Sequence, residues 1–161
     1  MSNARKKRNR KAWDRFGDIG KSTLIGAATL LPSRSKSGQT RVSAGACLIA
    51  IKLITEGLKT IIPERRPDGE DDKSFPSEHA AQCTAAAIII EREYPGMIGA
   101  AAYGLAAAVS LSRIASKKHH PRDVAAGALI GCVGVWVAAE FHSRRSGWRS
   151  LPENLEAVSK A

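Results

Sequence analysis

Long apolar segments separated by short polar ones dominate this chain. Four of them, at about 42–62, 77–93, 95–114 and 122–142, are rich in Ala, Ile, Leu, Val and Gly and are apolar nearly all round. This pattern is typical of helices that are buried on every side or that cross a membrane. We therefore predict an all-α protein, a helical bundle of four long, mostly transmembrane helices.

An amphipathic segment precedes these four. Trp13, Phe16 and Ile19 share one helical face, and only twelve uncharged residues lie between Lys21 and Arg34. Twelve residues make about 18 Å of helix, less than the roughly 30 Å of hydrocarbon in a bilayer. The bundle is therefore expected to carry a short N-terminal interfacial or re-entrant helix.

Further features bear on whether the long segments cross a membrane. Residues 94–112 give nineteen uncharged positions and residues 124–139 sixteen, whereas Lys52 and Glu56 interrupt the first segment. Glycines at 127, 131 and 134 would let helices pack closely. A soluble helical bundle is the alternative, since the mean hydropathy is -0.19 and 25% of the residues are charged.

Composition and charge divide the 161 residues into three parts. A basic arm at 1–12 holds six of the cations behind the net charge of +10, one domain covers 13–142, and a polar tail covers 143–161. The arm and the tail are expected either to be solvated or to contact anionic lipid. Nucleic acid is not an expected partner, because no aromatic residues alternate with the basic ones.

Residues suited to phosphate chemistry stand at the ends of the apolar segments. Antiparallel helices joined by short loops alternate their ends, so an up-and-down bundle would bring these residues to one face. Three are permanent cations, two are histidines, one is a carboxylate and one is a serine. They are Lys59, Arg66, Ser77, His79, Arg113, His119 and Asp123.

The cations and the serine suit the binding of a phosphoryl group. Lys59, Arg66 and Arg113 can neutralise its nonbridging oxygens, and a guanidinium does so with two parallel hydrogen bonds. Ser77 follows a proline and opens a helix, where its hydroxyl and the free backbone N–H groups form an anion site. Taken singly, such residues are more often helix caps or solvated charges.

The two histidines suit two roles in a displacement at phosphorus, one as nucleophile or base and one as proton donor. Asp123 lies four residues after His119, so its carboxylate could hold one ring nitrogen and leave the other as a nucleophile or base. His79 could then protonate the leaving oxygen. A metal site at His119, His120 and Asp123 is the alternative, although three nearby cations would repel a divalent ion.

The order and spacing of these residues resemble a known three-part signature. The parts are K-x6-RP at 59–67, PS-x-H at 76–79 and SR-x5-H-x3-D at 112–123. Together they resemble the type 2 phosphatidic acid phosphatase (PAP2) superfamily, over residues 42–134. One departure is Glu78, where glycine is more common in that family. Its carboxylate should either point away from the substrate or weaken phosphate binding.

The resemblance implies a helical bundle that works without a metal or other cofactor. In such a bundle His119 would attack phosphorus to form a phosphohistidine, Asp123 would orient it, and His79 would protonate the leaving group. The phosphoryl oxygens would be bound by the three cations and the serine, Lys59, Arg66, Arg113 and Ser77.

We therefore expect a multi-pass phosphatase of the bacterial inner (cell) membrane that hydrolyses a lipid phosphate or diphosphate. If the N-terminal helix does not span, the basic arm and tail share one side, which the positive-inside rule makes cytoplasmic. The active site would then face the periplasm or exterior.

The alternatives are a soluble or peripheral acid phosphatase on small phosphomonoesters, a vanadate-dependent haloperoxidase, and a non-catalytic module that binds anionic lipid. Neither the lipid nor the oligomeric state follows from the sequence.

Overall fold

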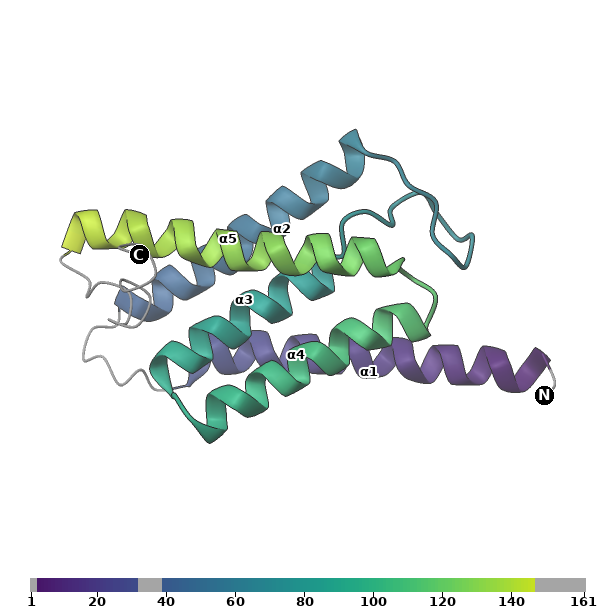
Figure 1. Cartoon of the computed structure of the whole chain (residues 1–161), viewed down its shortest axis with the longest axis horizontal. Coiled ribbons are helices and arrows are strands. Elements are labelled where there is room, and N and C mark those ends of the chain that lie inside the picture. The colour runs from purple at the N-terminus through teal and green to yellow at the C-terminus, as the bar shows by residue number, and fades with distance from the viewer. Residues whose placement is uncertain (1–2, 32–38, 147–161) are drawn as a thin grey trace, which may run out of the picture.

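The computed structural model describes residues 3–31 and 39–146, and the regular elements in this part of the chain are helices. They are α1 (Asn3–Leu30), α2 (Gln39–Ile61), α3 (Glu78–Glu93), α4 (Met97–Ala115) and α5 (Pro121–Ser146). The helices run up and down along one long axis (Figure 1). The all-α class is confirmed, and α2 to α5 begin and end within a few residues of the four predicted segments.

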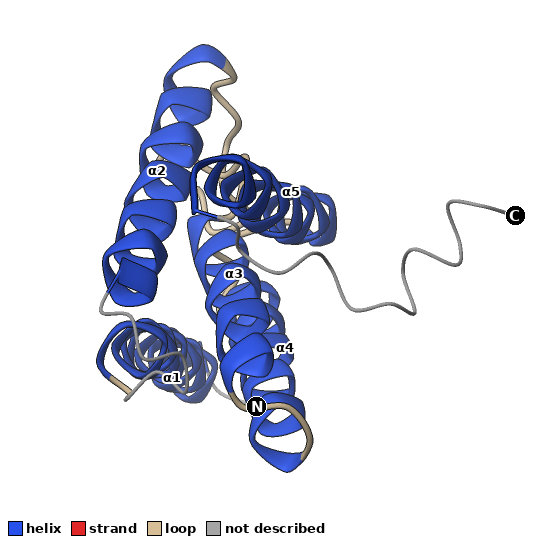
Figure 2. Ribbon diagram, turned by 90° about the vertical axis from the view of Figure 1, so that its left-hand side faces the viewer, coloured by secondary structure: helices blue, strands red, loops and turns tan. Residues whose placement is uncertain are grey.

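α3 lies at the centre of the bundle and packs against all four other helices (Figure 2). It begins after Ser77, whose hydroxyl accepts a hydrogen bond from the N–H of Ala80 at 3.4 Å. Small side chains let the neighbouring helices come close to it. Five alanines of α3 are completely buried: Ala80, Ala81, Ala85, Ala86 and Ala87.

Two glycines of α5 bring it into backbone contact with α3. A Cβ on Gly127 would lie 2.3 Å from the carbonyl oxygen of Ser77, and one on Gly131 would lie 2.3 Å from that of Ala81. A side chain does not fit in this space, so the close approach predicted from the glycine spacing is confirmed. The contact places the start of α5 beside the start of α3, where the N–H of Ser77 donates to the carbonyl oxygen of Asp123 at 3.0 Å.

α1 differs from the prediction. The basic residues at 5–11 continue the same helix that carries Trp13 and Phe16, so the expected short N-terminal helix is a helix of 28 residues, about 42 Å long. The prediction relied on the length of the uncharged run, whereas Arg and Lys are themselves good helix formers. α1 packs along α2, α3 and α4, with its basic half at the end of the bundle where α3 and α5 begin (Figure 1).

The course of α1 weakens the argument for the predicted orientation in a membrane. That prediction required an N-terminal helix that does not span, with the basic arm at the end opposite to the site. α1 instead runs the length of the bundle, and the arm lies at the site's own end (Figure 1). The charge count therefore favours a periplasmic or exterior site less strongly, and that orientation stays a prediction. Arg34, Lys36 and the tail after residue 146 lie outside the described residues.

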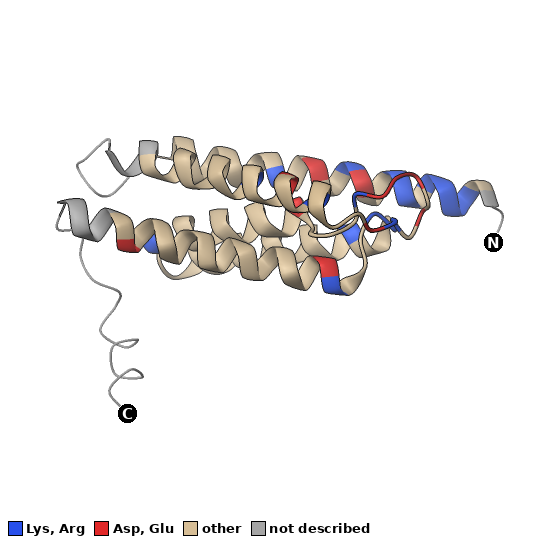
Figure 3. Ribbon diagram, turned by 90° about the horizontal axis from the view of Figure 1, so that it is seen from above, with Lys and Arg blue, Asp and Glu red and all other residues tan. Residues whose placement is uncertain are grey.

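The outside of the bundle is mainly apolar away from its most highly charged end. Lys, Arg, Asp and Glu gather around the α2–α3 and α4–α5 connections and along the first half of α1 (Figure 3). α4 and the part of α5 from Pro121 to Phe141 are long and apolar enough to cross a membrane, and they are the two such helices among the described residues. That α2 and α3 also cross stays a prediction. Large exposed apolar side chains on α4 and α5 include Leu111, Leu129, Trp136 and Phe141.

Candidate active site

The seven predicted site residues lie at the charged end of the bundle. Lys59 is near the end of α2, Arg66 is in the α2–α3 connection, and Arg113 is near the end of α4. Ser77 and Asp123 are completely buried at the same end. The other five line one pocket of about 240 Å³: Lys59, Arg66, His79, Arg113 and His119.

His119 has one ring nitrogen held and the other free. Its Nδ1 lies 2.6 Å from the carbonyl oxygen of Ser74. A carbonyl only accepts, so Nδ1 carries the proton. Nε2 has no hydrogen-bond partner among the described residues, and His119 lines the pocket. Nε2 is therefore the atom that can attack a group bound there.

Asp123 does not hold His119 directly, contrary to the prediction from their spacing. Its Oδ2 accepts from the hydroxyl of Ser74 at 2.5 Å and from the N–H of His120 at 2.8 Å. The described residues contain no hydrogen bond between Asp123 and His119. The prediction took a separation of four residues as close enough for contact, but α5 begins at Pro121 and His119 lies in the preceding connection.

Ser74 joins these two residues, and the sequence analysis missed it. It is completely buried, its carbonyl accepts from His119, and its hydroxyl donates to Asp123. The loop is fixed there by the N–H of Ser74, which donates to the carbonyl oxygen of Glu64 at 2.8 Å. Position in a loop follows no helical period, so nothing in the sequence pattern marks this serine.

The cations predicted to bind phosphate are paired with carboxylates. Lys59 Nζ lies 2.7 Å from Glu56 Oε1 and 3.7 Å from Glu78 Oε2. Arg66 Nε lies 2.7 Å from Asp71 Oδ1. Glu78 also lines the pocket, so its carboxylate lies beside the residues predicted to bind phosphate.

The metal alternative finds no support in the geometry. The described residues contain no group of three or more His, Cys, Asp and Glu placed to hold a metal ion. His120, the second histidine of that alternative, faces Glu64 at 3.8 Å and is not among the residues that line the pocket.

Comparison with known families shows which family this chain belongs to. The family model described as the PAP2 superfamily matches residues 40–146, which is most of the chain. The chain belongs to the PAP2 superfamily. The resemblance carried by the three motifs is thereby confirmed, and all seven candidate site residues fall within the matched PAP2 range.

Similar proteins share this PAP2 region. Lipid A 1-phosphatase of Porphyromonas gingivalis is 32% identical over 113 residues, which cover 65% of this chain and 25% of that protein. The chain thus spans about a quarter of the length of that relative.

Two solved structures share the fold. Aquifex aeolicus LpxE matches with a TM-score of 0.66 and 20% identity, covering 81% of this chain and 85% of that one. A transmembrane PAP2 type phosphatidylglycerolphosphate phosphatase from Bacillus subtilis matches with a TM-score of 0.63 and 21% identity, covering 92% and 91%.

α1 lies before the matched PAP2 range but contributes two carboxylates to the pocket, Asp14 and Asp18. The sequence analysis missed both. The signal was present, because Asp14, Asp18 and Lys21 are spaced four and three apart and so share a helical face. It was overlooked because the helix was not expected to lie along the site.

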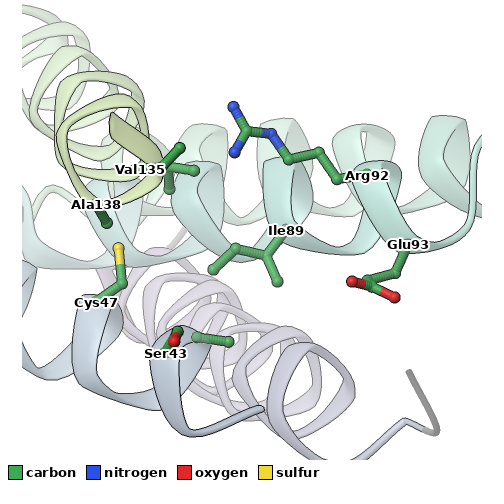
Figure 4. Close-up of a pocket in the computed structure, with 9 residues that line it drawn as sticks. Ser43, Cys47, Ile89, Arg92, Glu93, Val135 and Ala138 are labelled. Carbon is green, nitrogen blue, oxygen red and sulfur yellow. The ribbon is translucent and has the colours of Figure 1, made fainter. Parts of the chain in front are cut away.

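Two other cavities adjoin the PAP2 bundle. A groove of about 590 Å³ shares Asp14 and Lys118 with the active-site pocket and is also lined by basic residues of α1, Lys6, Lys7, Arg10 and Lys11. A smaller pocket of about 40 Å³ lies between α2, α3 and α5 at the opposite end, where Cys47, Ile89 and Val135 face it (Figure 4). The smaller pocket is mainly apolar and contains no histidine, so we do not assign it to catalysis.

Proposed function

We propose that this PAP2 protein is an integral-membrane phosphatase that hydrolyses a lipid phosphate or diphosphate through a phosphohistidine, without a metal or other cofactor. One observation carries the proposal: His119, with Nδ1 held and Nε2 free, lines a pocket that also holds Lys59, Arg66 and Arg113. The names of the relatives, a lipid A 1-phosphatase and a phosphatidylglycerolphosphate phosphatase, favour a lipid substrate.

The first step is attack by Nε2 of His119 on phosphorus. The Nε2–P bond forms while the bond from phosphorus to the leaving oxygen breaks, and the three cations with Ser77 stabilise the charge on the other oxygens. The hydrogen bond from Nδ1 to the Ser74 carbonyl stabilises the positive ring that results. His79 gives a proton to the leaving oxygen, so the lipid alcohol or lipid monophosphate departs.

The second step returns the enzyme to its starting form. His79, now neutral, takes a proton from water, the hydroxide attacks phosphorus, and inorganic phosphate leaves as His119 is released. Lys21 and Arg113 place positive charge around His79 and disfavour its protonation in the empty pocket. A bound phosphoryl anion opposes those charges, so we infer that substrate binding favours the protonated form of His79.

An acid limit near pH 4 is expected for kcat/KM. Burial is the main cause that lowers the pKa of His119 to about 4. The hydrogen bond to Ser74 raises this pKa, whereas the charges of Arg66 and Lys59 lower it. The nucleophile must be unprotonated, so activity should persist below the usual histidine pKa of about 6.5 and fall below about pH 4. The measurement is a pH profile of kcat/KM, corrected for the titration of the substrate. An acid limb near pH 6.5 would contradict the role of a buried His119.

Glu78→Gln is expected to lower KM about fivefold with little change in kcat, because a like charge at this range is worth about 1 kcal/mol in water. The Glu78 carboxylate lies 3.7 Å from Lys59 Nζ, where it competes with a phosphoryl oxygen. Glu56→Gln is the matched control, since Glu56 also pairs with Lys59 but does not line the pocket. A higher KM in Glu78→Gln would mean instead that Glu78 positions Lys59 for the substrate.

The apolar faces of α4 and α5 support a place in the bilayer. Their exposed side chains would face lipid, and the charged end of the bundle would lie at the membrane surface. A lipid could then present its phosphate to the pocket while its tail stays among the acyl chains. The relatives are bacterial, which favours the inner (cell) membrane of a bacterium and makes membrane lipids the other partners.

Phosphate release by the detergent-purified protein tests this function. The substrates are phosphatidate, phosphatidylglycerophosphate, a polyprenyl diphosphate, lipid A and a soluble aryl phosphate, all with EDTA present. We expect EDTA-resistant release from at least one lipid at a higher kcat/KM than from the aryl phosphate. Release from the aryl phosphate alone, by protein that carbonate strips from membranes, would establish a soluble or peripheral phosphatase. Lipid binding without any release would establish a non-catalytic module.

A further inference from the structure

α1 forms one wall of the active-site pocket. Asp14 and Asp18 are one helical turn apart and both line it. Gly17, between them, is buried, and a Cβ there would lie 2.4 Å from Nη2 of Arg113. Glycine therefore lets α1 come close enough for its carboxylates to reach the pocket. The wall is a packed contact rather than a loose cover.

Asp18 contacts the residue that we assign as the general acid. Its Oδ1 lies 2.8 Å from Nε2 of His79. Nη1 of Arg113 lies farther from the same nitrogen, at 3.5 Å, and an ionised carboxylate only accepts hydrogen bonds, so Nε2 carries a proton and donates it to Asp18. Nδ1 of His79 has no hydrogen-bond partner among the described residues. Nδ1 is thus the ring atom left to exchange a proton with the substrate.

Both carboxylates also hold Arg113, whose side chain is only 4% exposed. Nη2 of Arg113 donates to the carbonyl oxygen of Asp14 at 2.7 Å and pairs with Asp14 Oδ1 at 3.0 Å. Nη1 lies 3.6 Å from Asp18 Oδ1. Asp14 therefore serves Arg113, whereas Asp18 alone of the two reaches His79, and the two roles can be separated by mutation.

The charges around His79 explain why a carboxylate matters there. Lys21 from α1, Lys59 from α2 and Arg113 from α4 oppose a protonated ring, as does His119 when charged. Asp18 is the carboxylate in contact with the ring, and Glu78 precedes His79 in the chain. A carboxylate on one ring nitrogen stabilises the imidazolium that must form before the other nitrogen can give up its proton.

We propose that Asp18 is a positioning residue for proton transfer in this reaction. It holds Nε2–H of His79 throughout, so that Nδ1–H protonates the leaving oxygen and Nδ1 later takes a proton from the attacking water. Asp18 touches neither phosphorus nor the leaving group and acts through His79. The inference rests on the proposed phosphatase function.

Asp18→Asn in the full chain tests it with two substrates that differ in their need for a proton donor. An alkyl phosphate leaves as a strongly basic alkoxide unless it is protonated, whereas 4-nitrophenyl phosphate leaves readily as the anion. We expect kcat/KM for the alkyl phosphate to fall about 10- to 100-fold, and kcat/KM for 4-nitrophenyl phosphate to change by less than about threefold. This ratio reports the steps up to departure of the leaving group, so hydrolysis of the phosphohistidine, which both substrates share, does not enter the comparison. Asp18→Glu, which keeps a carboxylate, should recover part of the loss.

Asp14→Asn is the matched control. It weakens the hold on Arg113 but not on His79, so its loss should be the same for both substrates and should include KM. In a His79→Asn background Asp18→Asn should add no further loss. If Asp18→Asn is too unstable to assay, Asp18→Ser removes the same carboxylate and is judged by the same comparison.

The outcomes separate this inference from the function beneath it. Equal losses on the two substrates, or no loss on the alkyl phosphate, would overturn the role of Asp18 and leave the phosphatase function standing. Release of phosphate by the wild-type protein from neither these substrates nor any lipid of the panel would overturn the function itself.

Discussion

His119→Ala is expected to abolish phosphate release, with a fall in kcat of about 10⁴-fold or more. The substitution removes Nε2, the ring nitrogen without a hydrogen-bond partner in the described part of the chain. Without that atom no phosphohistidine can form, and water must attack phosphorus directly without a positioned nucleophile. The measurement is phosphate release from the lipid that the wild-type protein hydrolyses best.

The neighbouring histidine gives a matched control for this variant. His120 faces Glu64 and is not among the residues lining the pocket, so His120→Ala should keep kcat within a few-fold of wild type. Thermal unfolding of both variants in detergent establishes that they are folded. A folded His119→Ala protein that turns over within about tenfold of wild type would contradict the nucleophile assignment.

Asp123→Asn is expected to lower kcat by about 10²- to 10³-fold, by analogy with other carboxylates that orient a catalytic histidine. Asp123 is completely buried, and its Oδ2 accepts from the Ser74 hydroxyl and the His120 N–H. The amide has the same shape but no charge, so it accepts these hydrogen bonds more weakly and no longer stabilises a positive His119 ring. The measurement is kcat at saturating lipid, with KM determined separately.

Ser74→Ala shows whether Asp123 acts through Ser74. It removes the hydroxyl that reaches Asp123 but keeps the carbonyl that accepts from His119, so a smaller fall of about tenfold is expected. The double variant Ser74→Ala/Asp123→Asn should be no slower than Asp123→Asn alone, because both changes break the same hydrogen-bonded link from Asp123 through Ser74 to His119. Full activity in Asp123→Asn would contradict a role for the link from Asp123 through Ser74 to His119.

That the site residues lie together at one end of the bundle could be predicted from the sequence, because it depends only on the number of helices and the length of their connections. Four apolar segments with short connections leave little choice other than alternating directions, and the residues at their ends then share one end of the bundle. Lys59, Arg113 and His119 were brought together by this argument alone. Close packing of α5 followed equally from the spacing of Gly127 and Gly131, because a missing side chain permits approach, but the sequence did not predict that α3 would be the partner.

The hydrogen bonds within the site could not be predicted in the same way. A spacing of four residues joins side chains only within one helix, and the helix boundary at Pro121 separates His119 from Asp123. The serine that joins them lies in an irregular loop, whose course depends on contacts between distant segments. The length of α1 was predicted wrongly because its basic residues were not expected to be helical. Its two carboxylates that reach the pocket were therefore not recognised as site residues.

Trapping the intermediate tests the central claim most directly. Wild-type protein is mixed with the preferred lipid substrate labelled in its phosphate, quenched in alkali within a turnover, and digested for mass spectrometry of the peptide that holds His119. Phosphate on His119, stable to alkali, lost in mild acid and absent from His119→Ala, is the predicted result. Rapid turnover with no phosphorylated protein at any quench time, or phosphate on another residue, would contradict the account.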